Sequence, residues 1–407
     1  MPEAVIVAAT RSPIGRAFKG SLVDVRPDDL ATTVVRSALD QVPELDPATL
    51  DDLYLGCAEP REEHGGNMAR RVAVQLGLDQ LPASTVNRFC ASSVQTTQMA
   101  LHAIRAGVGE AFVSAGVECV SRYHNFGGAG VDVGQTHNPL FAAAEARTER
   151  YAASNDTWRD PREDGELPDI YIQMGQTAEN VATSRGVSRA EQDAFAARSQ
   201  QRTEAAMSAG VFASEITPIK VDDGGIVDSD ESPRAGTTVD KLAGLDPVFR
   251  PHGTVTAGNC CPLNDGAAAV VITSDERARE LGLQPLARVV TTTASALSPE
   301  IMGLGPVEST RRALDRAGMT IGDLDLVEIN EAFAAQVIPS ARDLGIDEDR
   351  LNVHGGAIAL GHPFGMTGAR ITTTMLNALR RRDGTRGLVT MCVGGGQGMA
   401  MILERMS

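Results

Sequence analysis

Three short segments far apart in this chain each carry a residue that can take part in acyl transfer. They are Cys90, then His362 within a glycine-rich turn, and Cys392, which precedes a run of three glycines. A thiol, an imidazole and a second thiol are the groups needed to form and break a thioester. The sequence therefore predicts an acyl-transfer enzyme.

Cys90 lies where a predicted strand ends and a predicted helix, Ser93 to Arg105, begins. The free amides and the dipole of a helix N-terminus stabilise a thiolate, so we expect the pKa of the Cys90 thiol to be lowered. A lone cysteine is more often a small buried apolar residue, and that interpretation applies to Cys57 and Cys119. The turn and the distant histidine and cysteine segments favour a nucleophile at Cys90.

The other two segments supply a base and an oxyanion donor. His362 lies between a glycine and a proline, and a histidine in such a turn can act as general base for a thiol. The glycines after Cys392 let backbone N–H groups converge on one point, and Gly394 is the donor expected there. Asn330 follows a predicted strand, where it can cap a helix or hold a water molecule, and the residues alone leave both readings open.

Composition narrows the class of protein. The chain has 407 residues, of which 42% are hydrophobic and 22% charged, as in ordinary α/β proteins large enough for two core-bearing units. The 53 acidic and 37 basic residues give a net charge of -16, which argues against nucleic acid or a membrane surface as a main partner. No apolar run has the roughly 18 to 20 residues of a membrane span, and the chain enters a strand-like run at once, so we expect a cytoplasmic location. Six scattered cysteines predict free thiols, and no cluster has zinc-ligand spacing.

Short β-rich runs alternate with amphipathic stretches along most of the chain. The predicted strands are Ala4 to Ala8, Leu53 to Leu55, Ala111 to Ala115, Ala268 to Thr273, Ala287 to Thr292, Leu326 to Ile329, Leu388 to Met391 and Met399 to Leu403. The predicted helices are Asp28 to Gln41, Ser93 to Arg105, Arg189 to Ser208, Val307 to Ala317, Ala332 to Leu344 and Gly368 to Arg381. This alternation predicts a layered α/β fold with mixed sheets.

A weak internal duplication predicts two similar halves. Cys90 and His362 each lie in a turn that is followed by a helix and then a strand, although any two βαβ units share that order. Residues 121–249 are rich in polar and turn-forming stretches such as Phe126 to Asn138, so we expect an inserted loop subdomain there. The N-terminal half would then be residues 1–120 with 250–283, and the C-terminal half residues 284–407.

These segments together resemble the thiolase family, and the match extends over nearly the whole chain. The shorter supporting segments are Arg11 to Gly15, Met174 to Asn180, Thr254 to Asn259, Asn264 to Ala268 and Asn330 to Phe333. The resemblance implies a five-layer αβαβα fold of two similar halves, with an inserted loop subdomain that covers coenzyme A. It also implies CoA and acyl-CoA as partners, no metal or redox cofactor, and a homodimer or homotetramer.

The resemblance also implies a role for each residue. Cys90 would be the acylated nucleophile, His362 its base, and Cys392 the acid/base at the α-carbon of the departing acetyl-CoA. One oxyanion hole would be His362 with a water held by Asn330, and the other would be the backbone N–H groups of Cys90 and Gly394. The CoA and acyl contacts would be Arg234, Met174, Leu245, Phe249, Ala257, Cys261 and Phe333.

Departures from the family pattern lie at the substrate site. Cys260, Cys261 and Pro262 stand where many members have Ala-Ser-Gly, Gln173 stands where a histidine is frequent, and Lys241 replaces a small polar residue. The segment from Tyr123 to Asp169 is longer than in short-chain members. We therefore expect an acyl pocket that accepts chains longer than acetoacetyl.

The function that these features favour is a 3-ketoacyl-CoA thiolase, which releases acetyl-CoA and a shortened acyl-CoA. A biosynthetic acetoacetyl-CoA thiolase would share the fold and the catalytic residues. A decarboxylating ketosynthase also has a cysteine at a helix start, but it typically uses histidines where this chain has Cys392. A non-catalytic CoA carrier is disfavoured because all four catalytic side chains are present.

Overall fold

The computed structural model describes residues 1–123, 126–127, 131–132, 137–154, 156–222 and 224–407. Part of the predicted polar stretch from Phe126 to Asn138 lies outside the described residues. Among the described residues, no helix combines the length and the apolar character needed to cross a membrane.

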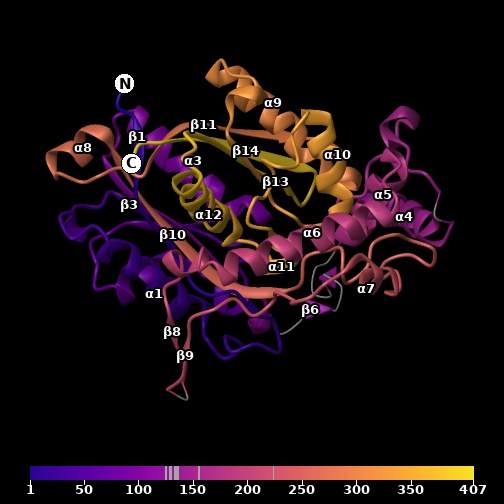
Figure 1. Cartoon of the computed structure of the whole chain (residues 1–407), viewed down its shortest axis with the longest axis horizontal. Helices are drawn as coiled ribbons and strands as arrows, with labels where there is room; N and C mark the ends of the chain where they lie inside the picture. Colours follow the sequence, from indigo (N-terminus) through magenta and orange to yellow (C-terminus); the bar gives the residue numbers. More distant parts are fainter. Residues whose placement is uncertain (124–125, 128–130, 133–136, 155, 223) are drawn as a thin grey trace.

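The strands and helices follow one another in a regular α/β order (Figure 1). The strands are β1 (Ala4–Arg11), β2 (Gly15–Arg16), β3 (Asp52–Gly56), β4 (Ala83–Val86), β5 (Ala111–Cys119), β6 (Phe126–Gly127), β7 (Val131–Asp132), β8 (Ile219–Lys220), β9 (Ile226–Val227), β10 (Asn264–Ser274), β11 (Ala287–Ala296), β12 (Leu326–Ile329), β13 (Arg386–Val393) and β14 (Gln397–Arg405). The α-helices are α1 (Pro27–Asp40), α2 (Met68–Gln75), α3 (Ser92–Arg105), α4 (Ala142–Ser154), α5 (Met174–Arg185), α6 (Arg189–Ser208), α7 (Val239–Ala243), α8 (Asp275–Glu280), α9 (Gly305–Ala317), α10 (Ala334–Leu344), α11 (Ala357–Leu360) and α12 (Thr367–Arg381).

Two groups of strands repeat one pairing pattern. In the first half β1 pairs antiparallel with β10, β10 antiparallel with β5, β5 parallel with β3, and β3 parallel with β4. In the second half β11 pairs antiparallel with β14, β14 antiparallel with β13, and β13 parallel with β12, which is followed by a parallel bridge between Val327 and Leu351. This correspondence confirms the predicted duplication, and it makes α3 and α12 equivalent helices.

The layers are defined by three groups of buried apolar side chains. Helices α1 and α2 cover the outer face of the first group of strands, and α9 and α10 cover the outer face of the second. Helices α3 and α12 pack between the two groups, as Figure 1 shows for α12, which has β13 and β14 on one side and β10 on the other. This is the predicted five-layer αβαβα arrangement. Short pairing of β1 with β11 joins the two groups into one continuous sheet.

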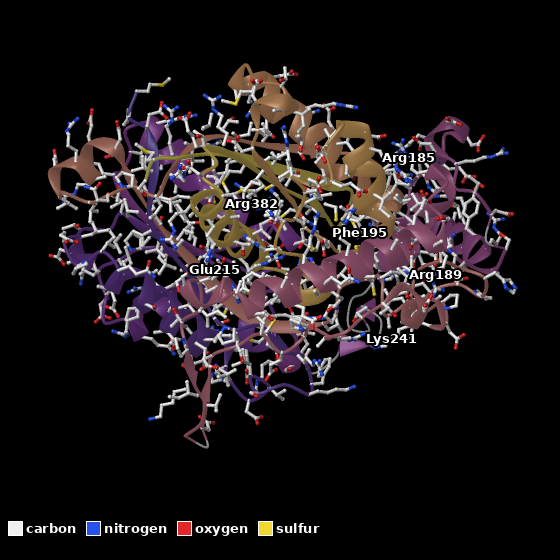
Figure 2. All side chains as sticks on the ribbon, viewed as in Figure 1. Arg185, Arg189, Phe195, Glu215, Lys241 and Arg382 are labelled. Carbon is white, nitrogen blue, oxygen red and sulfur yellow. The ribbon has the colours of Figure 1, made fainter. Side chains whose placement is uncertain are left out.

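The segment between β5 and β10 carries helices α4, α5, α6 and α7. Helix α6 begins with a capping box, in which Ser188 and Glu191 exchange side-chain and backbone hydrogen bonds, as its Ser-x-x-Glu pattern favours. Arg189 at its start donates to the carbonyl oxygens of Leu242 at 2.7 Å and Leu245 at 2.9 Å, which fixes α7 and the loop after it. Figure 2 shows Arg189 on α6 and Lys241 on α7 at this side of the molecule.

The predicted elements agree with the structure in their centres and differ at their ends. Predicted helix Arg189 to Ser208 and predicted strand Leu326 to Ile329 have the observed bounds, whereas the predicted strand beginning at Ala268 starts four residues earlier, at Asn264. Helices α2, α4, α5, α7, α8 and α11 were not predicted from the sequence. Helix α5 begins at Met174, within a segment that had been interpreted only as a family motif.

Close backbone packing joins the two halves beside the start of α3. A methyl group at Gly116 on β5 would lie 2.1 Å from the carbonyl oxygen of Gly365 and 2.7 Å from Cβ of Ser93. Only a residue without a side chain lets the turn before α12 approach β5 this closely.

Gly116→Ala should therefore destabilise the fold by about 1 to 3 kcal/mol, since overpacking of a rigid core forces backbone shifts. Urea denaturation of the purified variant checks this. Gly322→Ala is the control, because the nearest atom to its new methyl group would be Thr320 Oγ1 at 3.6 Å. Equal unfolding midpoints for both variants and the parent would contradict the packing argument.

Candidate active site

Cys90 occupies a sharp turn between β4 and α3. It lies in a short 3-10 helix, Phe89–Ala91, and is half-buried. Phe89 has a φ of 45°, a conformation that is costly for a residue with a side chain. Ser92 secures the turn, because its Oγ donates to the Phe89 carbonyl at 2.6 Å and accepts from the Arg88 N–H at 2.9 Å. The turn thus holds the thiol at the start of α3.

Burial dominates the acidity of this thiol. It raises the pKa of Cys90 to about 12, and the backbone N–H of Gly394, which lies within hydrogen-bonding range of the sulfur, offsets only part of that rise. The prediction of a lowered pKa from the helix start alone was therefore wrong for this structure. The desolvation imposed by the surrounding core exceeds the stabilisation from the helix terminus.

His362 is buried in the turn that precedes α12, and its hydrogen bonds fix its tautomer. Thr367 Oγ1 donates to the Pro363 carbonyl at 2.7 Å, so it accepts from His362 Nδ1 at 2.7 Å. Nε2 therefore carries the lone pair and faces Nδ2 of Asn330 at 3.3 Å. Burial, with a smaller effect of the Arg370 charge, lowers the pKa of His362 to about 3. The side chain is thus a neutral imidazole whose Nε2 can accept a proton.

Asn330 follows β12 and is held on its backbone side. Its N–H donates to Thr390 O at 3.0 Å, and its carbonyl accepts from Gln336 Nε2 at 2.8 Å. Its side-chain Oδ1 is buried and has no hydrogen-bond partner among the described residues. A buried amide oxygen of this kind needs a donor, which a bound water or substrate atom would supply. Of the two readings that the sequence left open, the geometry favours the water-holding one, since α10 begins only at Ala334.

Cys392 and Gly394 lie at the junction of β13 and β14. Cys392 is buried, and burial and then the nearby Cys90 raise the pKa of its thiol above the usual range. The turn continues through Gly395 and Gly396, with φ values of 72° and 77° that favour glycine. The turn therefore brings both a second thiol and a backbone donor to Cys90.

Arg88 links the two turns and was missed by the sequence analysis. Its guanidinium donates to Gln397 Oε1 at 2.8 Å and to Gln95 Oε1 at 2.7 Å, so it joins the start of β14 to the first turns of α3. Thr367 was missed as well. Their nearness in sequence to the catalytic candidates could have identified both residues. Arg88 stands two residues before Cys90, and Thr367 stands five residues after His362.

The predicted substrate residues divide into two sets. Met174, Phe249 and Phe333 pack into one apolar cluster that contains Cys392, and the rings of Phe249 and Phe333 meet edge to face at 6.2 Å. Cys261 borders this cluster through its N–H, which donates to Ala332 O at 3.0 Å.

The second set is exposed and lies further out. Arg234 and Leu245 are on the surface of the inserted segment, and Ala257 is exposed just after it. The charge of Arg234 opposes the rise that burial causes in the pKa of Cys260. This arginine therefore lies near the apolar cluster against which Cys260 packs.

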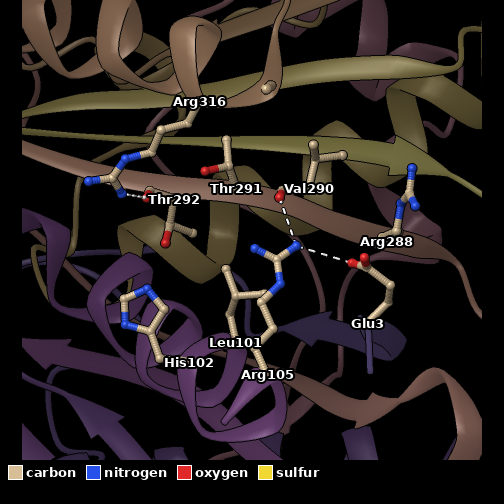
Figure 3. Close-up of a pocket in the computed structure, with 10 residues that line it drawn as sticks. Glu3, Leu101, His102, Arg105, Arg288, Val290, Thr291, Thr292 and Arg316 are labelled. Carbon is tan, nitrogen blue, oxygen red and sulfur yellow. Dashed lines mark hydrogen bonds and ion pairs between the residues drawn. The ribbon is translucent and has the colours of Figure 1, made fainter. Parts of the chain in front are cut away.

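A separate hollow of about 450 Å³ lies at the far end of α3, about 22 Å from Cys90 at a helix rise of about 1.5 Å per residue (Figure 3). Arg105 donates to Val290 O at 3.0 Å, and Arg316 donates to Thr292 O at 3.1 Å. These carbonyls belong to β11 beyond its short pairing with β1, so the two arginines complete the hydrogen bonding of a strand edge. The hollow is therefore explained by the junction of the two halves.

The described histidine, cysteine and acidic side chains do not gather into a group that could hold a metal ion. The chemistry available at the site is that of two thiols, one neutral imidazole, an unpartnered amide oxygen and backbone N–H groups. Such a set can form an acyl-thioester and move a proton to or from carbon.

Comparison with known proteins gives full-length matches. Residues 4–276 match the thiolase N-terminal domain, and residues 283–405 match the thiolase C-terminal domain. The chain is 41% identical to the 3-ketoacyl-CoA thiolase of Bacillus subtilis, which it covers completely with 99% of its own length. It is 44% identical to an acetyl-CoA acetyltransferase of Pseudomonas aeruginosa and 43% identical to the 3-oxoadipyl-CoA/3-oxo-5,6-dehydrosuberyl-CoA thiolase of Escherichia coli, each with 100% of both chains covered.

Solved structures show the same similarity. The acetyl-CoA acetyltransferase of Bacillus anthracis superimposes with a TM-score of 0.86 at 38% identity, over 100% of this chain and 99% of that one. Human mitochondrial 3-ketoacyl-CoA thiolase in complex with CoA gives a TM-score of 0.85 at 35% identity, over 100% of this chain and 98% of that one.

Thr367→Val should lower kcat by about tenfold to a hundredfold with little change in KM, because His362 loses the partner that fixes its tautomer. Steady-state kinetics of acyl transfer check this. Thr367→Ser retains the hydroxyl and should restore most of the activity. Full activity in the valine variant would show that the hydrogen bond at Nδ1 has no part in positioning the base.

His362 should also make the fold sensitive to acid. Its folded-state pKa of about 3 lies below the unfolded value of 6.5, so only the unfolded chain takes up this proton as pH falls from 6.5 towards 3. Stability present above pH 6.5 is therefore lost in that window, by about 2 kcal/mol at pH 5.

Urea denaturation at pH 7 and pH 5 checks this, with His362→Asn as the comparison. The variant should lose about 2 kcal/mol less than the parent on acidification, because asparagine does not titrate. Equal losses would mean that His362 is charged or exposed in the folded protein.

Proposed function

The chain belongs to the thiolase family of acyltransferases, and from that premise we propose that it cleaves 3-ketoacyl-CoA with CoA to give acetyl-CoA and a shortened acyl-CoA. The observation that carries the proposal is the convergence of Cys90, the Cys392 thiol and the Gly394 N–H at one point. The neutral His362 lies in the turn that packs on the first residues of α3, where Ser93 Oγ accepts from the Ala369 N–H at 2.9 Å.

In the first half-reaction Cys90 Sγ attacks the 3-keto carbon while His362 Nε2 takes the thiol proton. The C2–C3 bond then breaks, its electron pair passes to C2, and the Cys392 thiol protonates C2 so that acetyl-CoA leaves. Cys90 retains the shortened acyl group as a thioester. Neutral forms of both thiols suit this sequence, because each gives up its proton only when a reacting atom is in place.

In the second half-reaction the thiol of a new CoA gives its proton to the Cys392 thiolate and attacks the acyl carbon. The Cys90 thiolate leaves, and the proton held on His362 returns to it, so the enzyme is regenerated. The oxyanion formed at the acyl carbon would lie against the N–H groups of Cys90 and Gly394. In the first half-reaction, the thioester oxygen of the acetyl unit would lie against the Nε2–H that His362 gains from the Cys90 thiol and against a water on Asn330 Oδ1, and such donors contribute about 3 to 4 kcal/mol each.

The binding surface proposed for CoA is mainly the inserted segment. The exposed Arg234 would meet the nucleotide end, with Leu245 and Ala257 along the pantetheine chain and Met174, Phe249 and Phe333 at its reactive end. Support comes from the aromatic pair beside Cys392 and from the solved relative that binds CoA. Homodimer or homotetramer formation, a cytoplasmic location, a part in fatty-acid β-oxidation and independence from cofactors stay predictions.

A biosynthetic acetoacetyl-CoA thiolase is the second candidate. The similarity to an acetyl-CoA acetyltransferase at 44% identity favours it, and the same catalytic residues would serve. The two candidates differ in the length of chain that the acyl pocket accepts.

Thiolysis assays with ketoacyl-CoA substrates from four carbons upwards separate the candidates. We expect a higher kcat/KM for a longer chain than for acetoacetyl-CoA, because each buried methylene contributes about 0.8 kcal/mol. The highest kcat/KM at four carbons would favour the biosynthetic thiolase instead. Intact-mass measurement should show an acyl adduct on the parent and none on Cys90→Ala, and an adduct on that variant would remove Cys90 as the nucleophile.

A further inference from the structure

A pocket of about 400 Å³ lies between the inserted segment and the loop that follows β11. Most of its walls are apolar. The residues that line it are Phe141, Asp160, Arg162, Leu167, Pro168, Ile170, Leu297, Ser298 and Pro299. It is distinct from the hollow at the far end of α3.

This pocket shares its walls with the catalytic turn between β13 and β14. The Leu297 N–H donates to Gly396 O at 2.8 Å. A methyl group at Gly395 would lie 3.7 Å from both Ile170 Cδ1 and Phe89 Cε2. The pocket therefore adjoins the same turn that brings the Gly394 N–H to the Cys90 sulfur.

Hydrogen bonds to the buried Glu300 carboxylate hold the two segments that form the pocket together. Glu300 accepts from Arg147 at 2.6 Å, from Trp158 Nε1 at 2.7 Å and from the Asp169 N–H at 2.9 Å. Its carboxylate is thus satisfied within the protein. The segment that carries Ile170 is fixed against the loop that carries Pro299 by these bonds.

Two polar groups in the pocket have unused hydrogen-bonding capacity. Within the described part of the chain, the guanidinium of Arg162 has no hydrogen bond or ion pair, and Ser298 Oγ is buried without a partner. The Asp160 carboxylate is engaged at Oδ1, which accepts the Arg162 backbone N–H at 3.0 Å. The pocket therefore offers apolar walls, one cation and one hydroxyl donor.

We propose that this pocket receives the far end of the acyl chain and that Arg162 and Ser298 select a chain ending in a carboxylate. The preferred substrates would be CoA thioesters of 3-oxodicarboxylic acids. This inference rests on the proposed thiolase reaction and names its substrate class. A guanidinium can hold a carboxylate through two parallel hydrogen bonds, and the methylenes between the keto group and the carboxylate would lie along the apolar walls.

The test compares 3-oxoadipyl-CoA with 3-oxohexanoyl-CoA, which have acyl chains of equal length and differ in the terminal carboxylate. The parent enzyme should have the higher kcat/KM for 3-oxoadipyl-CoA. Arg162→Met should lower that value by about tenfold or more and leave the value for 3-oxohexanoyl-CoA unchanged, because it removes the charge and keeps the apolar stem. Arg159→Met is the matched control, since Arg159 is exposed nearby and does not line the pocket.

Asp160→Asn gives a change of the opposite sign. It removes the one carboxylate of the pocket that would repel the substrate, so the preference for 3-oxoadipyl-CoA should increase. Equal selectivity in the parent and in Arg162→Met, with 3-oxohexanoyl-CoA cleaved, would overturn this inference and leave the thiolase reaction intact. Failure to cleave either substrate, together with no acyl adduct on Cys90, would overturn both.

Discussion

A buried carboxylate, Glu118, is the interaction on which the geometry of the active site depends. It accepts from the Ala58 N–H at 2.8 Å, from the Gly365 N–H at 2.7 Å and from the Tyr123 hydroxyl. These donors belong to the end of β3, to the turn that carries His362 and to the end of β5. A buried carboxylate without hydrogen-bond partners would cost several kcal/mol. The need for all three donors therefore holds the three segments together around Glu118. Gly116, two residues earlier on β5, allows the same turn to pack against the strand.

The tight packing that follows also sets the protonation of the site. Burial raises the pKa of Cys90 and lowers the pKa of His362, so both groups are neutral over the physiological range. A dry site disfavours a lasting thiolate–imidazolium pair, but it strengthens every donor aimed at a transient oxyanion. Helices α3 and α12 both begin beside the reacting groups, and their N-termini favour negative charge there. The arrangement therefore favours charge on the reacting substrate more than on the resting enzyme.

Patterns local in sequence were the part of the molecule that could be predicted. The order of turn, helix and strand around Cys90 and His362 indicated the duplication, and the amphipathic period located most helices of the two halves. The pKa of Cys90 was predicted in the wrong direction, because a helix start is a local feature and desolvation comes from the whole core. Arg88 and Glu118 were not identified, since their partners lie 309 and 247 residues away. Contacts over such separations leave no period or spacing in a single sequence.

The two halves differ most at one equivalent connection. In the second half β13 passes into β14 through Gly394, Gly395 and Gly396, and this short turn brings a backbone donor to Cys90. In the first half the same connection, from β5 to β10, is expanded into the long segment from Val120 to Leu263 that carries α4 to α7. The chemical groups therefore reside on the duplicated framework, whereas most of the contacts proposed for CoA and the acyl chain reside on the expansion. Because Arg162 belongs to the expansion, the acyl selection proposed for it can change without moving any group that makes or breaks the thioester.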